Sequence, residues 1–391
     1  MHCDPRFSRV REVFQRHFTE DLELGAAFAV YYGGELVVDL WDGVADRHTG
    51  RRWEHDTPAF AYSCTKAITA TVLLQLAERG LVDVSAPVAD VWPEFAAEGK
   101  ASITVEHLLT HQAGLPTIDE PVPVAEFEDQ PAIAARLAAQ APSWEPGSAH
   151  GYHALTYGFL VGEVVRRVTG KSVGDLVAAE IAGPLGLDLW VGAPDFVIDR
   201  AARLKGPDRR SGPVTAVPEP AATAGPPDDA DVFTRMAAAA RDPRSLMNRA
   251  LGNPSMQLLE GGANNPVVLR AGWPAAGVVT SAAGLAGFYR SLVAGELLRP
   301  ETLREAVRPR VTGPDRVLYV DSSFGLGYMR PAMTFLSPSP SAFGHSGMGG
   351  FLGLGDPEHG LAVGYVMNKM ADAVSGSMRA YHLTQAVYES L

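Results

Sequence analysis

The spacing of apolar residues changes early in the chain. Between residues 6 and 20, apolar side chains recur at helical intervals, which predicts an amphipathic helix. Residues 26–32 and 35–41 are instead rich in β-branched, aromatic and other apolar residues, as strands are. Gly33 and Gly34 separate these two runs, and two glycines between strands favour a tight turn. The N-terminal part therefore predicts a helix followed by a β-hairpin.

Helical spacing dominates the long middle part of the chain, where glycine and proline residues separate the segments. In the first of these segments, 63–79, apolar residues are frequent, no proline interrupts, and Gly80 follows as a stop signal. The same reasoning predicts further helices over 104–109, 131–141, 152–169 and 283–297.

The C-terminal part returns to a pattern that is typical of strands. Candidate strands are 324–329, 349–354 and 361–367, of which the last is the clearest apolar run. The polar stretch 356–360 between the last two contains proline and glycine, which favour a hairpin turn. A closing helix over 375–391 completes the pattern.

Strands at both ends of the chain and helices between them predict an α+β fold, with an antiparallel sheet flanked by helices. The simplest arrangement has a discontinuous sheet region, 1–62 and 266–391, with a mostly helical region, 63–265, inserted between its two parts. Prolines and glycines are concentrated in 204–230. This stretch is either a long surface loop or a partly disordered segment, and the pattern does not choose between the two.

Composition restricts the possible functions. The chain of 391 residues is 46% hydrophobic and 20% charged, as globular proteins are, and its net charge of −12 argues against nonspecific nucleic-acid binding. The N-terminus has no apolar signal-peptide core and no apolar run is long enough to span a membrane, so we expect a soluble cytoplasmic protein. Cys3 and Cys64 are the only cysteines, which argues against a disulfide framework and a metal cluster. We expect no metal and no other cofactor.

Ser63 and Lys66, at the start of the first predicted helix of the middle part, form a candidate catalytic pair. Residues three apart share one face of a helix, and the helix N-terminus favours negative charge. Most Ser-x-x-Lys strings have no function, but lysine is rare here: the chain has five lysines among 33 basic residues. Only Lys66 has a serine three positions before it. A buried lysine can lose its proton and act as a base, whereas arginine cannot.

Two further features lie downstream. Tyr152 follows a Pro-Gly turn and precedes a predicted helix, and Gly-His-Ser-Gly at 344–347 precedes a glycine-rich strand candidate. In order and spacing, the three features resemble the serine β-lactamase and penicillin-binding-protein superfamily, nearest to the class C enzymes and the β-lactamase-fold esterases of carboxylesterase family VIII. The likeness runs over roughly residues 10–390. It implies a β-lactamase/transpeptidase-like fold with the active site at the junction of the sheet and helical regions.

The resemblance implies a role for each of these residues. Ser63 would be the nucleophile, Lys66 its base, and Tyr152 a partner in moving the proton. The main-chain N–H groups of Ser63 and Met348 would form the oxyanion hole. The substrate-binding residues would be those that stand where the superfamily usually has Lys-Thr-Gly, namely His345, Ser346 and Gly347.

These roles agree with elementary chemistry. A serine or tyrosine hydroxyl does not ionise unaided at neutral pH. Burial lowers the pKa of a lysine so that the amine can accept a proton, and a nearby cation favours a phenolate. Two N–H donors aimed at the developing oxyanion contribute on the order of 3 kcal/mol each to catalysis. An acyl-enzyme on Ser63 would form and then be hydrolysed by water.

Two departures from the superfamily pattern bear on the substrate. The second motif is often Tyr-x-Asn, but Ala154 occupies the amide position here, and His345 replaces the lysine of the third motif. In β-lactamases these two groups help to hold the amide and the carboxylate of the antibiotic. Their loss favours a neutral ester, so we expect a serine carboxylesterase that acts on small, short-chain esters, in an oligomeric state that stays open.

Other functions stay open as alternatives. A β-lactamase, a D-amino-acid peptidase and an acyltransferase would use the same fold, and a non-catalytic binding protein is the alternative from another class. Tyr152 is also open to a second interpretation, as an aromatic residue that packs on the core at a helix start. Tyr157 is its rival but lies further into the helix. His111 and His150 are expected to be structural or surface residues.

Ser346 offers a competing nucleophile. The string Gly-His-Ser-Gly-Met around it nearly matches the Gly-x-Ser-x-Gly elbow of α/β-hydrolases, with Met348 at the last glycine position. That elbow needs an aspartate and a histidine later in the chain. Asp356, His359 and His382 do follow, but without the usual succession of strand and helix. We therefore favour Ser63 as the nucleophile.

Overall fold

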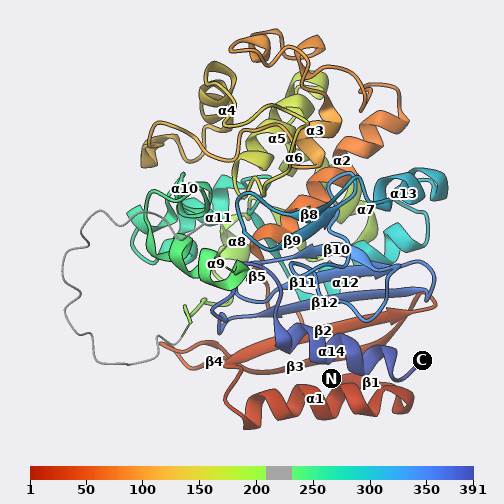
Figure 1. Cartoon of the computed structure of the whole chain (residues 1–391). Helices are drawn as coiled ribbons and strands as arrows, with labels where there is room; N and C mark the ends of the chain where they lie inside the picture. Colours follow the sequence, from red (N-terminus) through yellow and green to blue (C-terminus); the bar gives the residue numbers. More distant parts are fainter. Residues whose placement is uncertain (208–230) are drawn as a thin grey trace.

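The computed structural model describes residues 1–207 and 231–391 (Figure 1). In this view a large sheet occupies the lower part of the molecule, with α1 (Ser8–Thr19) beneath it and α14 (Met378–Tyr388) in front of its lower strands. Most of the other helices lie above the sheet. The loop predicted for 204–230 falls mostly outside the described residues, so neither of its two interpretations is tested.

The large sheet has seven strands and is antiparallel throughout. Its strand order is β1-β3-β2-β12-β11-β10, and β4 pairs with β3. Strands from the two ends of the chain meet where β2 pairs with β12, which confirms the predicted sheet from both chain ends. The strands are β1 (His2–Cys3), β2 (Gly25–Tyr32), β3 (Glu35–Asp46), β4 (Arg51–Arg52), β10 (Phe343–Ser346), β11 (Leu352–Asp356) and β12 (Leu361–Met367).

Both predicted hairpins are confirmed. Tyr32 pairs with Glu35 across Gly33 and Gly34, whose φ values are 58° and 89°. Two successive residues with positive φ suit glycine, and a two-residue turn of this kind matches the twist of the flanking strands. The second hairpin joins β11 to β12.

The helix α12 (Ala282–Val293) covers one face of the large sheet, where it packs on β2, β11 and β12. Its close approach depends on Gly364 of β12, because a Cβ at this position would lie 2.2 Å from Ala282 O. On the other side of the sheet, α1 packs against α14 and also contacts β3. Helices thus cover both faces of the sheet, as the predicted α+β fold requires.

The upper part of the molecule is built around α2 (Thr65–Glu78), which is buried on almost every side and contacts α5. A helix that is buried all round belongs to the core of a larger assembly of helices. The other helices are α3 (Val105–Leu109), α4 (Gln130–Ala139), α5 (Thr156–Thr169), α6 (Val173–Leu176), α7 (Gly183–Leu185), α8 (Asp195–Ile198), α9 (Val232–Arg241), α10 (Leu246–Gly252), α11 (Pro266–Ala271) and α13 (Pro300–Val307).

Two small sheets complete the fold. One has the order β5-β7-β6, and the other pairs β8 with β9. Their strands are β5 (Ala59–Phe60), β6 (Leu189–Val191), β7 (Val278–Thr280), β8 (Val311–Pro314) and β9 (Asp321–Phe324). The strand predicted for 324–329 is wrong beyond Phe324, because Gly327 has a φ of 82° and turns the chain there.

Among the predicted helices that begin later than the apolar pattern indicates are the two that carry candidate catalytic residues at their start. The helix predicted over 63–79 opens with a 3₁₀ turn, Tyr62–Cys64, and becomes α-helical only afterwards. The helix predicted from Tyr152 begins at Thr156, as α5. Both candidate catalytic residues Ser63 and Tyr152 therefore lie just before a helix. The division of the chain into a sheet region and a helical region stays a prediction.

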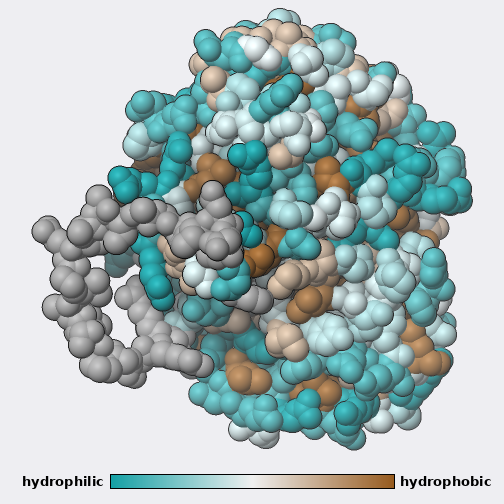
Figure 2. Space-filling model, in the orientation of Figure 1, coloured by the Kyte–Doolittle hydropathy of each residue, from teal (hydrophilic) through white to brown (hydrophobic). Residues whose placement is uncertain are grey.

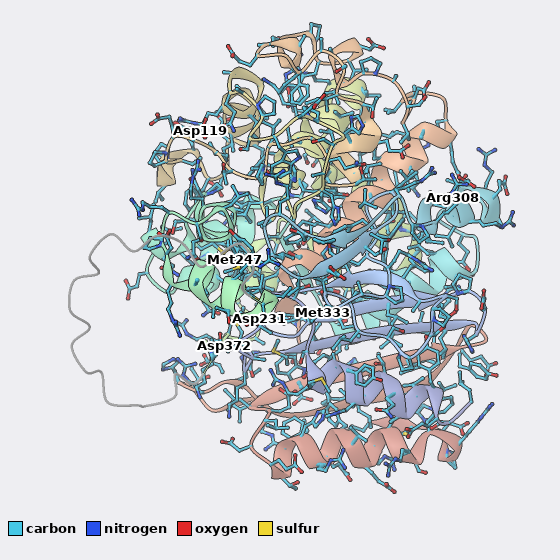
Figure 3. The ribbon with its side chains drawn as sticks, viewed as in Figure 1. Asp119, Asp231, Met247, Arg308, Met333 and Asp372 are labelled. Atoms are coloured by element: carbon cyan, nitrogen blue, oxygen red, sulfur yellow. The ribbon has the colours of Figure 1, made fainter. Side chains whose placement is uncertain are left out.

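The face shown in Figure 2 is mostly hydrophilic, with hydrophobic residues in small separate groups. Single exposed apolar residues such as Met333, which lies in front of the large sheet in Figure 3, are normal on globular proteins. None of the described helices is both long enough and apolar enough to cross a bilayer.

Candidate active site

Ser63 lies in the 3₁₀ turn Tyr62–Cys64, which links β5 to α2. Tyr62 has a φ of 46°, a left-handed conformation that few residues other than glycine adopt. Thr65 holds this turn in place: its Oγ1 donates to Tyr62 O at 2.6 Å and accepts from Val278 N–H at 2.9 Å. Because the turn is tied to β7 in this way, Ser63 has a fixed position at the start of α2.

Lys66 lies one helical turn beyond Ser63 and is completely buried. Its Nζ is 3.0 Å from Ser63 Oγ, 2.7 Å from Ala154 O and 3.0 Å from Ala275 O. Burial lowers the pKa of this amine well below the usual 10.5, and only the thiol of Cys64 opposes the shift. A neutral amine has two N–H bonds and one lone pair. When the amine is neutral and both N–H bonds are directed to the carbonyls, its lone pair can face Ser63 Oγ and accept the serine proton.

Tyr152 lies just before α5, and its hydroxyl interacts with the side chain of Ser63. Lys66 Nζ is 4.7 Å from the centre of the tyrosine ring, and the ring stacks on Phe324 with 6.2 Å between the centroids. Burial raises the pKa of the phenol. Burial thus disfavours a phenolate at Tyr152, and the expectation that a nearby cation favours one stays a prediction.

Tyr157, the rival tyrosine, is directed to the main chain of α2 instead. Its hydroxyl donates to Lys66 O at 3.4 Å. A Cβ at Gly327 would lie 2.6 Å from this hydroxyl, so the group is enclosed between α2 and the turn that follows β9. The structure thus brings Tyr152, and not Tyr157, to Ser63.

Asp315, which no motif in the sequence indicates, positions Tyr152. Its Oδ1 accepts the main-chain N–H bonds of Tyr152, Val317 and Leu318 at 3.0, 2.9 and 2.9 Å. Its Oδ2 accepts from Ser322 Oγ at 2.9 Å. A buried carboxylate with four donors is fully satisfied, and it fixes the segment that carries Tyr152 against the connection between β8 and β9.

Three histidines hold the same segment. His153 donates its main-chain N–H to His111 Nδ1 at 3.0 Å, and its Nε2 accepts from Leu115 N–H at 2.9 Å. His150 Nε2 lies 3.0 Å from Ser322 Oγ. Burial lowers the pKa of His111, and that of His153 to about 4, so both rings are neutral at neutral pH. These contacts fit the structural role expected for His111 and His150.

His345 lies within β10 rather than before a strand, and its carbonyl accepts a hydrogen bond from Cys64 Sγ at 3.4 Å. This contact ties β10 to the turn that carries Ser63. His345 Nδ1 donates to Ser346 O at 2.7 Å, since a carbonyl can only accept, and Nε2 therefore carries a lone pair. Burial lowers the pKa of the ring to about 3, and Nε2 has no partner among the described residues. Where the superfamily has a cationic donor, this chain thus has a neutral acceptor.

Ser346 and Gly347 occupy different places relative to Ser63. The hydroxyl of Ser346 lies 3.1 Å from Thr334 O and 2.6 Å from Ser375 Oγ, so it is engaged by neighbouring loops. Its contact with substrate stays a prediction. Gly347 lies against the chain just before Ser63, because a Cβ at Gly347 would be 2.5 Å from Ala61 O. This close approach brings the end of β10 to the nucleophile turn.

The main chain turns sharply just after Gly347, and Met348 lies in this turn. Gly349 and Gly350 have φ values of 83° and 120°, so β11 begins at Leu352 and not at 349 as predicted. Among the described residues, the N–H groups of Ser63 and Met348 donate to no acceptor. An oxyanion hole requires free N–H donors of this kind, and the role of these two groups stays a prediction.

The alternative in which Ser346 is the nucleophile lacks the required histidine partner among the described residues. His359 Nδ1 lies 2.9 Å from Asp356 Oδ2 at the β11–β12 hairpin, and the ring of His382 lies 6.4 Å from that of His17. Neither histidine contacts Ser346 in the part of the chain that the structure describes. Within the same residues, no group of three or more histidine, cysteine, aspartate or glutamate side chains is arranged to hold a metal ion.

Comparison with known proteins shows the family of the chain. The model of the beta-lactamase family matches residues 14–388. The chain belongs to the beta-lactamase family. A solved family VIII carboxylesterase is 35% identical with a TM-score of 0.86, and the alignment covers 100% of this chain and 99% of that one. A penicillin-binding-protein homologue from Caulobacter crescentus is 38% identical with a TM-score of 0.84 and the same coverage.

A curated protein is similar over almost the whole chain. "Esterase/beta-lactamase LipL" of Mycobacterium tuberculosis (strain ATCC 25618 / H37Rv) is 35% identical over 400 residues, which cover 97% of this chain and 86% of LipL. Family membership confirms the resemblance and the fold that the motifs indicate. The catalytic roles of Ser63, Lys66 and Tyr152 in this chain stay predictions. The geometry of the site agrees with them.

Proposed function

We propose that this chain is a serine carboxylic ester hydrolase that forms an acyl-enzyme on Ser63. One observation carries the proposal: the buried amine of Lys66 lies 3.0 Å from Ser63 Oγ, with two main-chain carbonyls within hydrogen-bond distance. A neutral amine whose lone pair faces a serine hydroxyl is what general-base activation of the serine requires. The names of LipL and of the solved carboxylesterase both refer to ester hydrolysis, which supports this reaction.

In the acylation step, Ser63 Oγ attacks the carbonyl carbon of the ester, and its proton passes to Lys66 Nζ. The N–H groups of Ser63 and Met348 stabilise the oxyanion, and loss of one such donor costs about 100- to 1000-fold in rate. When the tetrahedral intermediate collapses, Tyr152 donates its hydroxyl proton to the leaving alkoxide. The Lys66 ammonium then returns a proton to Tyr152, so that both groups are neutral again.

Deacylation runs through the same groups. Water attacks the acyl carbonyl while Lys66, with Tyr152, accepts its proton. The second tetrahedral intermediate expels Ser63 Oγ, which regains a proton from the Lys66 ammonium. The carboxylic acid leaves, and the site returns to its resting state.

The substrate that this site fits is a neutral ester. His345 presents an uncharged acceptor at Nε2, so a substrate carboxylate would face a lone pair where the superfamily offers a cation. Ala154 supplies its carbonyl to Lys66 and has no side-chain amide to hold a substrate amide. Small esters with short acyl chains are therefore the substrates that we propose.

Hydrolysis of p-nitrophenyl acetate and butyrate tests the assignment. Ser63→Ala should lower kcat/KM by about 1000-fold or more, because the covalent route is lost. Ser85→Ala, at an exposed serine beyond the end of α2, is the matched control and should retain wild-type values. Undiminished hydrolysis by Ser63→Ala would disprove the proposed nucleophile.

β-Lactam hydrolysis is the second candidate, because the name of LipL includes that activity and the likeness extends over 97% of this chain. The same acyl-enzyme chemistry would serve. His345 and Ala154 predict that kcat/KM for nitrocefin lies below that for p-nitrophenyl butyrate. The reverse order would make the chain a β-lactamase first and an esterase second.

A further inference from the structure

The turn that carries the Met348 N–H depends on support from outside. Gly349 and Gly350 both have positive φ, and glycine restricts the main chain less than any other residue. Within the turn, Gly350 N–H donates to Gly347 O at 3.1 Å, and Gly347 N–H donates to Phe351 O at 2.8 Å. These two bonds close the turn on itself but do not fix its position relative to Ser63.

Arg379, at the start of α14, reaches the outer side of this turn. Its Nη2 donates to Gly349 O at 3.3 Å and to Lys369 O at 2.8 Å. The segment after β12 also bonds to the turn: Ala371 N–H donates to Gly349 O at 2.8 Å, and Gly349 N–H donates to Ala373 O at 2.9 Å. One arm of the guanidinium thus joins the turn to the segment that supports it.

The other arm of Arg379 is anchored beside the large sheet. Its Nη1 donates to Leu22 O at 2.6 Å and to Glu23 Oε2 at 2.9 Å. Glu23 is buried, and the hydroxyl of Tyr365 in β12 donates to its Oε1. A guanidinium holds its donors in a rigid planar fork, so fixing one arm also fixes the direction of the other. Buried ion pairs often add little net stability to a protein. For the ion pair between Arg379 and Glu23, we therefore test a role in positioning the turn.

We propose that Arg379, anchored by Glu23, is a positioning residue that holds the Met348 N–H in place in the oxyanion hole. Arg379 acts on the turn through Gly349 O and has no role in binding the substrate. The inference rests on the proposed function, because only the chemistry at Ser63 requires the oxyanion hole. A shift of about 1 Å in a catalytic group costs on the order of 100-fold in rate, so a small movement of this turn is sufficient to impair the reaction.

Charged and titratable groups face Glu23 from several elements. Arg379 of α14, Tyr365 of β12 and Lys369 after β12 all act on its carboxyl group. His17 of α1 lies near Arg379, and burial lowers its pKa to about 4, so it adds no charge at neutral pH. Burial raises the pKa of Glu23 to about 7. At pH 8 the anchor is therefore mostly an ion pair, and the test is made at that pH.

The substitution Arg379→Lys separates the contact with Glu23 from the contact with Gly349 O. The ammonium can still pair with Glu23, which preserves the buried ion pair, but a single point donor cannot also hold Gly349 O. We expect kcat for p-nitrophenyl butyrate to fall about 10- to 100-fold, with KM within about twofold of wild type. Affinity for a trifluoromethyl ketone, which binds as a tetrahedral adduct, should fall by the same factor. Arg167→Lys, in an ion pair with the buried Glu163 of α5, is the matched control and should keep wild-type values.

Wild-type kcat and wild-type affinity for the ketone in a folded Arg379→Lys protein would overturn the proposal. Amide hydrogen exchange over 347–351 gives a readout that does not depend on activity. We expect faster exchange over 347–351 in the lysine variant than in the wild type, and unchanged exchange over the hairpin 352–367. Equal exchange rates over 347–351 in the two proteins would count against the positioning role of Arg379. If the wild type neither hydrolyses esters nor reacts with a fluorophosphonate at Ser63, the proposed function fails, and the exchange measurement still decides the role of Arg379.

Discussion

Replacing Lys66 with methionine changes both the activity and the pH dependence of stability, because the variant keeps a buried apolar stem and loses the amine. Loss of a general base costs about 100- to 10,000-fold in rate, and we expect ester hydrolysis to fall by at least that much. The stability measurement is the more informative of the two, since it reports the protonation state of Lys66 in the resting protein.

The sign of the stability effect follows from the pKa of Lys66 in the two states. Burial holds this pKa well below 10.5 in the folded protein, whereas the unfolded chain keeps the usual value. Between the two values the unfolded chain binds a proton that the folded chain does not. The free energy of unfolding of the wild type therefore rises with pH across this window, by about 1.4 kcal/mol per pH unit. Methionine does not titrate, so the variant lacks this slope.

The protonation state of Lys66 is tested by how the difference in unfolding free energy between the two proteins changes with pH. A constant difference between the two proteins does not test it. Methionine also leaves Ala154 O and Ala275 O without their donor, which costs about 1–3 kcal/mol for each carbonyl at every pH. Urea unfolding at pH 8, 9 and 10 should give a wild-type-minus-variant difference that rises by about 1.4 kcal/mol per unit. Lys171→Met, at an exposed lysine, should show a flat difference. A flat difference for Lys66→Met would mean that Lys66 is protonated in the folded protein and is not the resting base.

Two further comparisons of variants give sharp expectations. Tyr152→Phe should lower kcat for p-nitrophenyl butyrate by about 100-fold or more through loss of the proton donor, whereas Tyr157→Phe should keep most of the activity; equal losses would contradict the choice of tyrosine. Glu23 has a pKa raised from 4.5 to about 7 by burial, so its stabilising contribution is complete below pH 4.5 and is lost as pH rises through 7. Relative to Glu23→Gln, the wild type should therefore lose roughly 3 kcal/mol of unfolding free energy between pH 4.5 and 8, measured by urea unfolding, and a constant difference would show that the carboxyl is not perturbed.

The elements and residues that could be predicted from the sequence have a local signal. Gly33 and Gly34 specify a hairpin by their position between two strand patterns, and both have the positive φ that the turn needs. Ser63, Lys66 and Tyr152 were found because hydroxyl and amine side chains in ordered motifs indicate a particular chemistry. The structure then places the three side chains together, although Tyr152 precedes α5 instead of beginning it.

The remainder of the site has no local signal. The carbonyls of Ala154 and Ala275, which orient the amine of Lys66, are main-chain groups that any residue would supply. Asp315 lies 163 positions from Tyr152, and Arg379 lies 356 positions from Glu23, so only the fold brings each pair together. The strands β5, β6 and β7 have two or three residues each, which is too few for a hydrophobic period to show.

An acid-quenched reaction with p-nitrophenyl butyrate, followed by intact-mass and peptide mass spectrometry, tests the acyl-enzyme most directly. We predict that the chain gains the mass of one butyryl group and that the group maps to Ser63. Tyr152→Phe should not move the adduct to another residue. A butyryl group on Ser346 or another side chain, or rapid hydrolysis with no acyl group on Ser63 at any quench time, would contradict the account.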